Sequence, residues 1–306
     1  MKPWVFLFPG QGSQYVGMGR EFYENYSEVS ELFTAAGDVL GMDIARLCFE
    51  GPEEVLVQTE NVQPAITVVN LACLTVLQLH DIYPVATAGH SLGEYAALYA
   101  AGVLDLANVL KLVRWRGKFM QEAALEEPGA MAAIMELEDE KLHEICRICD
   151  VEVANINCAE QIIITGPDEP VKRAIAMSTD AGAKKCVLLN VSGPWHSRCM
   201  TSARDKFAPV VHQCQFKDPK IPVINNVDAQ PLKSAAEVPD ALIHQLCSAV
   251  LWRQSMDWLI AAGHSSFVEV GPKKVLRGLM RRINREAKVI NVEDPISLTT
   301  FLQANQ

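Results

Sequence analysis

Residues 89–93 read Gly89-His90-Ser91-Leu92-Gly93, a Gly-x-Ser-x-Gly sequence, and they separate an apolar run at 82–88 from a helical pattern at 95–101. A serine on a sharp turn between a strand and a helix has a strained backbone, and glycines two residues to either side let neighbouring chain pass closely. The stretch therefore predicts a nucleophile elbow from which Ser91 projects. Because short patterns of this kind also occur by chance in glycine-bearing loops, the remainder of the chain has to support it.

The composition indicates a globular protein without disorder or repeats. The chain has 306 residues, of which 49% are hydrophobic and 21% are charged, and this length is enough for one large domain or two smaller ones. The net charge of -10 argues against nucleic acid as the main partner, since phosphate binding requires an electropositive face.

Location is suggested by the cysteines and by the apolar segments. Nine scattered cysteines without an export signal indicate reduced thiols, so we expect a cytoplasmic protein. The longest apolar stretch, Pro64–Leu79, is interrupted by polar residues and is shorter than a membrane span. We therefore predict a buried helix there and no association with a membrane. Cys146 and Cys149, with His143 nearby, lie in an amphipathic helical pattern without a second ligand pair, so we expect no metal site.

The chain predicts a large α/β body, with a parallel sheet core, that carries a small insertion. Within the insertion the expected order is strand, helix, two strands, helix and strand, which is the ferredoxin-like pattern; these elements are expected at 130–137, 138–149, 151–165 (two strands), 168–180 and 185–191. We therefore predict a small subdomain at 128–194 and a large catalytic subdomain at 1–127 and 195–306, with the active site in the cleft between them.

A serine hydroxyl needs a base within hydrogen-bond reach, and His196 is the best candidate to serve Ser91. It follows the last strand of the predicted insertion at a Gly-Pro turn, where the chain re-enters the large body. His90 is expected to point to the other side of the elbow. No Asp or Glu is an evident third member, which leaves open that a backbone carbonyl orients the imidazole.

The glycine-rich loop at 8–14 is expected to face the elbow. Such a loop can bring a backbone N–H to a reacting carbonyl, so that it and the N–H of Leu92 together form an oxyanion hole. A phosphate loop is the competing interpretation, but the loop lacks the later glycine and lysine of that motif.

Basic residues gather near the C-terminus, at Lys273, Lys274, Arg277, Arg281 and Arg282. A solvated helix face is the common meaning of such a run. The alternative is a docking site for an acidic protein or a phosphorylated cofactor.

Several ordered blocks together resemble the malonyl-CoA:acyl carrier protein transacylases, an acyltransferase family of fatty acid and polyketide synthesis. The blocks are Pro9–Gln14, Gln63-Pro64-Ala65, Gly89–Tyr95, Val113–Gly117, Gly193–Ser197 and Val268–Pro272. The resemblance runs from about residue 4 to about residue 285. It implies an α/β-hydrolase-like large subdomain with a ferredoxin-like insertion, in agreement with the pattern above.

The resemblance implies roles for individual residues. Ser91 would take the malonyl group as nucleophile, and His196 would act as its base in a ping-pong acyl transfer. Gln11 and Leu92 would supply the oxyanion N–H groups. Arg116 would hold the malonyl carboxylate, because its planar guanidinium matches a carboxylate and stays charged.

Four further expectations come with the resemblance. Gln63 and Trp195 would contact substrate. Trp195 departs from the smaller residue or phenylalanine expected at this position of the family, and its size would narrow the acyl pocket toward malonyl rather than methylmalonyl. The main-chain carbonyl of Leu251 would orient His196. Malonyl-CoA and an acyl carrier protein would be the partners, with the basic residues as the docking site for the carrier. No metal or bound cofactor would be needed.

Three alternatives remain open at this point. The same elbow could serve an acyl-thioester hydrolase, and a trans-acting acyltransferase of a polyketide synthase is a near relative. A non-catalytic subunit that docks the carrier would keep the basic residues, but it would not need Ser91, Arg116 and His196 together.

Overall fold

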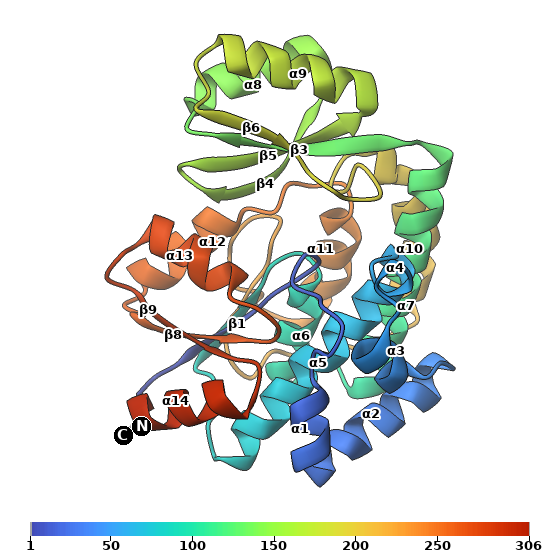
Figure 1. The fold of residues 1–306 in the computed structure, drawn as a ribbon, viewed down its shortest axis with the longest axis vertical. Coiled ribbons are helices and arrows are strands. Elements are labelled where there is room, and N and C mark those ends of the chain that lie inside the picture. The colour runs from blue at the N-terminus through green and yellow to red at the C-terminus, as the bar shows by residue number, and fades with distance from the viewer. Residues whose placement is uncertain (1, 306) are drawn as a thin grey trace.

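The computed structural model describes residues 2–305, which form a larger part built on a five-stranded sheet and a smaller part built on a four-stranded sheet (Figure 1). The strands of the larger sheet are, in spatial order, β7 (Val223–Ile224), β2 (Ala86–Gly89), β1 (Val5–Phe8), β8 (Ser266–Val270) and β9 (Lys288–Val292). Every neighbouring pair is parallel. The predicted α/β fold with a parallel sheet core is confirmed.

Helices cover both faces of this sheet, as a parallel sheet requires. In β1, Phe6 and Phe8 pack into a core formed with one group of helices, whereas Val5 and Leu7 face the other group. The first group contains α5 (Thr59–Leu79), α6 (Gly93–Ala100) and α7 (Leu106–Glu126), and the second contains α12 (Trp252–Ala261) and α13 (Val275–Ile283). The continuous apolar run of β1 thus reflects burial on both sides.

The remaining helices surround the larger sheet. They are α1 (Arg20–Asn25), α2 (Ser27–Leu40), α3 (Ile44–Glu50), α4 (Glu53–Leu56), α10 (Thr201–His212), α11 (Val238–Gln245) and α14 (Pro295–Asn305), with 3-10 turns at Arg198–Met200 and Ala235–Glu237. Near the two chain ends, the Lys2 ammonium donates to the carbonyl of Ala304, so the first and last described segments lie side by side (Figure 1).

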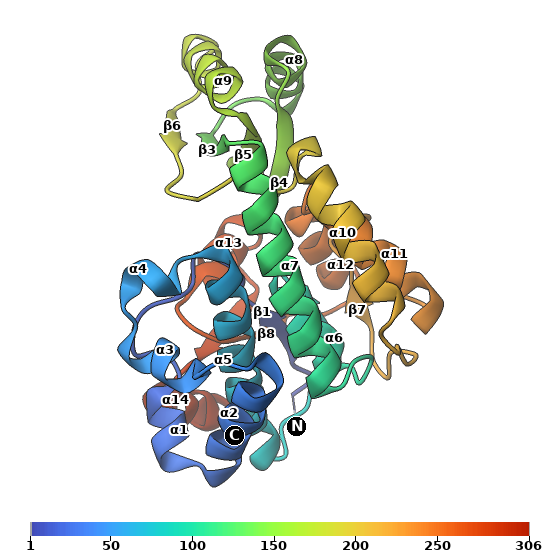
Figure 2. The ribbon, with the colours of Figure 1, turned by 90° about the vertical axis from the view of Figure 1, so that its right-hand side faces the viewer.

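Helix α5 is the buried helix that the apolar stretch predicted, although it begins at Thr59 rather than Pro64. By length and apolar composition it could cross a membrane, but 83% of its most apolar window is buried inside the protein. Figure 2 shows α5 running beside α7 through the middle of the larger part. Its apolarity is that of a core helix.

The smaller part is ferredoxin-like, as predicted. Its elements follow in the order β3 (Gly129–Met135), α8 (Asp139–Cys149), β4 (Glu152–Cys158), β5 (Gln161–Pro167), α9 (Asp168–Asp180) and β6 (Lys185–Leu188). The sheet order is β4-β5-β3-β6, with every pair antiparallel. The last strand ends at Leu188 rather than at residue 191, because the chain then leaves the sheet to line the pocket described below.

The two faces of the smaller sheet serve different neighbours. Ala132 and Ile134 of β3 pack under α8 and α9, whereas Met131 and Ala133 join the core of the larger part. Cys146 and Cys149 are buried on the inner side of α8, so they belong to this small core. Successive side chains of β3 therefore point alternately into the core of the smaller part and toward the larger part, so the smaller sheet packs on the larger part through one face (Figures 1 and 2).

Candidate active site

Ser91 occupies a sharp turn between β2 and α6, with a backbone φ of 51° that is rare for a residue with a side chain. The flanking glycines are required by close packing. A Cβ on Gly89 would lie 1.9 Å from the carbonyl carbon of Gly93, and a Cβ on Gly93 would lie 2.0 Å from the carbonyl oxygen of Phe8. The geometry is that of the predicted nucleophile elbow.

His196 is the histidine that reaches the serine. Its Nε2 lies 2.7 Å from Ser91 Oγ, and the side chain is 4% exposed. His90 instead points away from the hydroxyl, since its Nε2 lies 2.8 Å from Asn157 Oδ1 and its ring packs on Trp252. The choice of His196 over His90 agrees with this geometry.

A main-chain carbonyl orients His196, as expected, but the predicted residue is wrong. The Nδ1 of His196 lies 2.8 Å from the carbonyl oxygen of Gln245, at the end of α11. Leu251 does not do this, since its carbonyl accepts both the N–H and the hydroxyl of Ser255 in the first turn of α12. The carbonyl of Gln245, six residues before Leu251, therefore has the role that was predicted for Leu251.

The environment keeps the imidazole of His196 neutral. Burial, followed by the positive charge of Arg116, lowers the pKa of His196 to about 3. A neutral imidazole with its Nδ1 proton directed at a carbonyl has a free lone pair on Nε2, aimed at the serine hydroxyl. The pair is therefore set to take a proton from Ser91.

Arg116 is a buried cation that has only neutral partners within the described chain. It is 1% exposed, and its guanidinium donates to Gln63 Oε1 over 2.8 Å, to Gln245 Oε1 over 2.9 Å and to Ser91 Oγ over 3.1 Å. Its Nε has no hydrogen-bond partner among residues 2–305, and no carboxylate there forms a salt bridge with it. Burial lowers its pKa, because the charge is partly desolvated. An unpaired buried cation beside a nucleophile is suited to an anionic acyl group.

Gln63 does not fit its predicted role in binding substrate. Its side chain is completely buried behind Arg116, donates to Met120 Sδ and does not line the pocket. A buried amide cannot reach a ligand through the guanidinium that it supports. Gln63 therefore positions Arg116.

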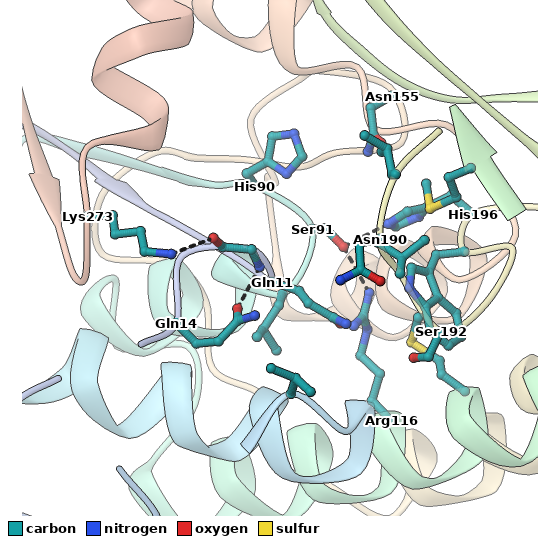
Figure 3. Close-up of a pocket in the computed structure, with 18 of the residues that line it drawn as sticks. Gln11, Gln14, His90, Ser91, Arg116, Asn155, Asn190, Ser192, His196 and Lys273 are labelled. Carbon is teal, nitrogen blue, oxygen red and sulfur yellow. Dashed lines mark hydrogen bonds between the residues drawn. The ribbon is translucent and has the colours of Figure 1, made fainter. Parts of the chain in front are cut away.

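The pocket above Ser91 has a volume of about 460 Å³ and is enclosed by both parts of the protein (Figure 3). Ser91, Arg116 and His196 meet at one end of it, whereas Lys273 and Gln14 lie at the opposite end. The smaller part contributes Met131 and Asn155. The site thus lies in the cleft between the two sheets, where the sequence placed it.

The apolar wall and the expected oxyanion donors line the same pocket. Met120, Met131 and Trp195 form the wall near Arg116. Gln11 and Leu92 face the pocket from the loop after β1 and from the elbow. Neither of their main-chain N–H groups is used in a hydrogen bond within residues 2–305, so both are available to an oxyanion.

The basic residues are divided by the structure. Lys273 lines the pocket and its Nζ lies 3.4 Å from the carbonyl oxygen of Gly12, in the turn before α13. Lys274 and the three arginines of α13 (Arg277, Arg281, Arg282) are exposed outside the pocket. Their suggested docking role remains a prediction. No group of three or more potential metal ligands occurs within residues 2–305.

Three buried polar residues of the site were not predicted from the sequence: Glu94, Asn226 and Gln245. Gln245 Nε2 donates to Glu94 Oε2 over 2.5 Å and to the Ser91 carbonyl over 3.1 Å. Burial raises the pKa of Glu94 to about 7. Glu94 alone carried a signal, because it follows the elbow directly; Asn226 and Gln245 lie in unremarkable loop and helix sequence.

Comparisons with known proteins agree with this geometry. The family model for the acyl transferase domain matches residues 5–298. Malonyl CoA-acyl carrier protein transacylase of Bacillus subtilis (strain 168) is 42% identical over 98% of this chain and 96% of its own length. The protein of the same name from Escherichia coli O157:H7 is 41% identical over 99% of this chain and 100% of its own length.

Solved structures show the same fold. An acyl carrier protein S-malonyltransferase from Vibrio cholerae superposes with a TM-score of 0.95 at 40% identity, covering 98% of this chain and 100% of the other. A malonyl-transacylase solved in complex with its type II polyketide synthase acyl carrier protein gives a TM-score of 0.96 at 39% identity, covering 99% and 100%.

Proposed function

Because the chain belongs to the acyl transferase family, we propose that it transfers a malonyl group from malonyl-CoA to the phosphopantetheine thiol of an acyl carrier protein through an ester on Ser91. The observation that carries the acyl specificity is the position of Arg116. Its buried guanidinium contacts Ser91 Oγ and has no carboxylate partner among the described residues. A malonyl group on the serine would bring that carboxylate.

In the first half-reaction, Ser91 Oγ attacks the thioester carbonyl while its proton moves to His196 Nε2. The carbonyl oxygen becomes an oxyanion, and the N–H groups of Gln11 and Leu92 stabilise it. When the intermediate collapses, the carbon–sulfur bond breaks and CoA leaves with the proton held by His196. The product is malonyl-Ser91.

The second half-reaction repeats these steps with a different thiol. His196 takes the proton of the carrier thiol, the thiolate attacks the ester carbonyl, and Ser91 Oγ leaves with that proton. The carbonyl of Gln245 holds Nδ1 throughout, so the imidazole needs no carboxylate to fix its tautomer. The proposed reaction uses no metal or bound cofactor.

The exposed cations of the turn before α13 and of α13 itself are proposed as the docking site for the carrier. The carrier would be acidic, so electrostatic attraction would steer its approach. Lys273 lies at the end of the pocket opposite Arg116 (Figure 3), on the side from which a pantetheine arm would enter. A cytoplasmic location fits a reaction between soluble substrates.

Mass spectrometry of the Ser91 peptide tests the proposal. The purified protein is incubated separately with malonyl-CoA, acetyl-CoA and methylmalonyl-CoA, and then with holo carrier protein. We expect a malonyl adduct that moves to the carrier. Rapid loss of the adduct to water would indicate a hydrolase, and the absence of any adduct would indicate a non-catalytic docking subunit. Carriers from fatty acid and polyketide synthesis, offered in turn, identify the pathway that the enzyme serves.

A further inference from the structure

The backbone of the elbow is strained at Ser91, so surrounding hydrogen bonds must stabilise its conformation. Ser91 has a left-handed φ of 51°, a conformation that a residue with a side chain keeps only where its surroundings over-determine it. On the downstream side, main-chain bonds suffice: the N–H of Gly93 donates to the His90 carbonyl, and that of Glu94 donates to the Ser91 carbonyl. On the upstream side, the N–H of His90 donates to the carbonyl of Phe8 over 3.0 Å, but the N–H of Ser91 itself has no main-chain partner among residues 2–305.

Asn226 supplies that partner with both ends of its side-chain amide. Its Oδ1 accepts the N–H of Ser91 over 2.7 Å, and its Nδ2 donates to the carbonyl of Gly89 over 2.7 Å. An amide is the side chain that can bind one donor and one acceptor of the main chain at the same time. The Asn226 side chain thus bridges the last residue of β2 and the nucleophile.

Asn226 is itself fixed by the fold. The parallel register of β7 with β2 pairs Ile224 with Ala88, which brings the residues after each strand together. The Asn226 N–H donates to Glu94 Oε2 over 3.3 Å and its carbonyl accepts the N–H of Leu251 over 2.9 Å. Since the residue is 1% exposed, water does not compete for these bonds.

The conformation of the elbow also sets the direction of a catalytic N–H. In a trans peptide the C=O and N–H point in opposite directions. The carbonyl of Ser91 accepts Gln245 Nε2 over 3.1 Å, so the N–H of Leu92 in the same peptide points away from Gln245. Turning the Ser91 backbone would therefore move both Oγ and this oxyanion donor.

We propose that Asn226 is a positioning residue that clamps the elbow between Gly89 and Ser91, and thereby sets the reactivity of Ser91 toward every acyl group alike. Arg116, in contrast, acts on the carboxylate of one acyl group. The two residues should therefore separate experimentally. The clamp deepens the function proposed above, but it can be tested without it.

The test measures Asn226→Ala with two reagents. Phenylmethylsulfonyl fluoride modifies an activated serine with loss of fluoride and carries no carboxylate, so its rate of labelling Ser91 reports the reactivity of the serine independently of acyl recognition. Acylation by malonyl-CoA and acetyl-CoA reports the reaction. We expect both rates to fall on the order of 10- to 100-fold, the effect of a misplaced reacting group, with KM and the malonyl-to-acetyl ratio unchanged.

Asn225→Ala is the matched control. Asn225 is also buried, but its side chain bonds only within its own turn: Oδ1 accepts the N–H groups of Val227 and Asp228, and Nδ2 donates to Asp228 Oδ1 and to the carbonyl of Gln230. Its variant should lose stability and keep the labelling rate of the folded protein. If Asn226→Ala does not fold, Asn226→Asp replaces it. The aspartate keeps the size of the side chain and an acceptor for the Ser91 N–H, but it loses the donor to the Gly89 carbonyl. It should therefore slow the reaction of Ser91 with both reagents.

Three outcomes would overturn the clamp: a normal sulfonyl fluoride rate in the Asn226 variants, an equal loss in Asn225→Ala, or a changed malonyl-to-acetyl ratio. The last would mean that Asn226 acts through Arg116. If the unmodified protein reacts with the sulfonyl fluoride but with no acyl-CoA, the proposed function fails, while the labelling comparison still decides the clamp.

Discussion

The guanidinium of Arg116 donates a hydrogen bond to the hydroxyl of Ser91, over 3.1 Å from Nη2 to Oγ. His196 Nε2 lies 2.7 Å from the same oxygen. The nucleophile is thus held between a base and a fixed cation. In the proposed reaction, His196 activates the serine toward any acyl group, whereas Arg116 favours an acyl group that carries its own negative charge.

Replacing Arg116 by alanine should abolish this preference. We expect kcat/KM for malonyl-CoA to fall about 100-fold, roughly 3 kcal/mol, the cost of truncating one member of a buried charge pair. Transfer from acetyl-CoA should fall much less, because no carboxylate loses its partner. Steady-state assays with both donors measure the ratio. Arg114→Ala, on the same helix with its side chain at Met42, is the control; an equal loss with both donors would contradict the role of Arg116.

Gln63→Ala should give a weaker effect of the same kind. Gln63 touches Arg116 but not the pocket, and a hydrogen bond to a charged group contributes about 1.5–3 kcal/mol. We expect kcat/KM for malonyl-CoA to fall about tenfold, with the malonyl preference reduced. In Gln121→Ala, which loses a bond to the Thr59 N–H, the preference should stay. A Gln63 variant with full malonyl preference would show that Arg116 needs no support.

The pH dependence of acylation follows from the state of His196. Only neutral imidazole accepts the Ser91 proton, so the rate falls as pH falls through the pKa of His196. Since that pKa is lowered to about 3, Ser91 malonylation should be flat from neutral pH down to about pH 5. Acid-quenched mass spectrometry measures the profile. Arg116→Ala removes a charge that lowers this pKa, so its acid limb should shift to higher pH.

A fall centred near 6.5 in the unmodified enzyme would show that His196 is not desolvated as described. His196→Ala provides the reference, because loss of a general base lowers kcat about 10²- to 10⁴-fold.

Trp195→Ala should widen the acyl pocket. Trp195 is buried in the wall of the pocket next to His196. One methyl group in an apolar pocket changes discrimination by about 1–3 kcal/mol, so methylmalonyl-CoA should gain about tenfold relative to malonyl-CoA. Competition between the two donors measures this ratio, and Trp195→Phe should lie between. An unchanged ratio would remove Trp195 from selectivity.

Reversing two charges on α13 should selectively weaken binding of the carrier protein. Arg281→Glu with Arg282→Glu should raise KM for the carrier protein much more than KM for malonyl-CoA, because both side chains are exposed outside the pocket. The effect should shrink as salt is added. Lys172→Glu with Arg173→Glu makes the same change of charge on α9 and should leave both constants alone. Equal rises for both substrates would point to a shared site or to misfolding.

Much of the site could be predicted because local sequence encodes it. Gly-x-Ser-x-Gly specifies the elbow, since only glycine avoids the 1.9 Å and 2.0 Å contacts at residues 89 and 93. The helix at Asp168–Asp180 was predicted at its observed bounds, because its apolar spacing and first-turn acids are local signals. His196 was identified from its place at the return from the inserted subdomain.

The residues whose roles were predicted wrongly or not at all have a different explanation. Gln245 rather than Leu251 orients His196 because the end of α11, and not the start of α12, offers a carbonyl beside Nδ1. Gln63 has the sequence position of a ligand-binding residue, but the packing of α5 against α7 buries its side chain behind Arg116. Whether a carbonyl or an amide is free or occupied depends on what the fold brings next to it.

The family resemblance implied the role of Arg116, and the position of His196 after the insertion suggested the base. The sequence by itself determined the elbow with Ser91 and the α/β core with its ferredoxin-like insertion. These depend on backbone sterics and on periodic apolar spacing, which act over a few neighbouring residues. Only the tertiary structure decided that Asn226 spans the strained serine, 135 positions away along the chain, and that Gln245 meets both His196 and Arg116. Polar side chains in loops and at helix ends acquire their partners when the parallel strands bring segments that are distant in the sequence to one edge of the sheet.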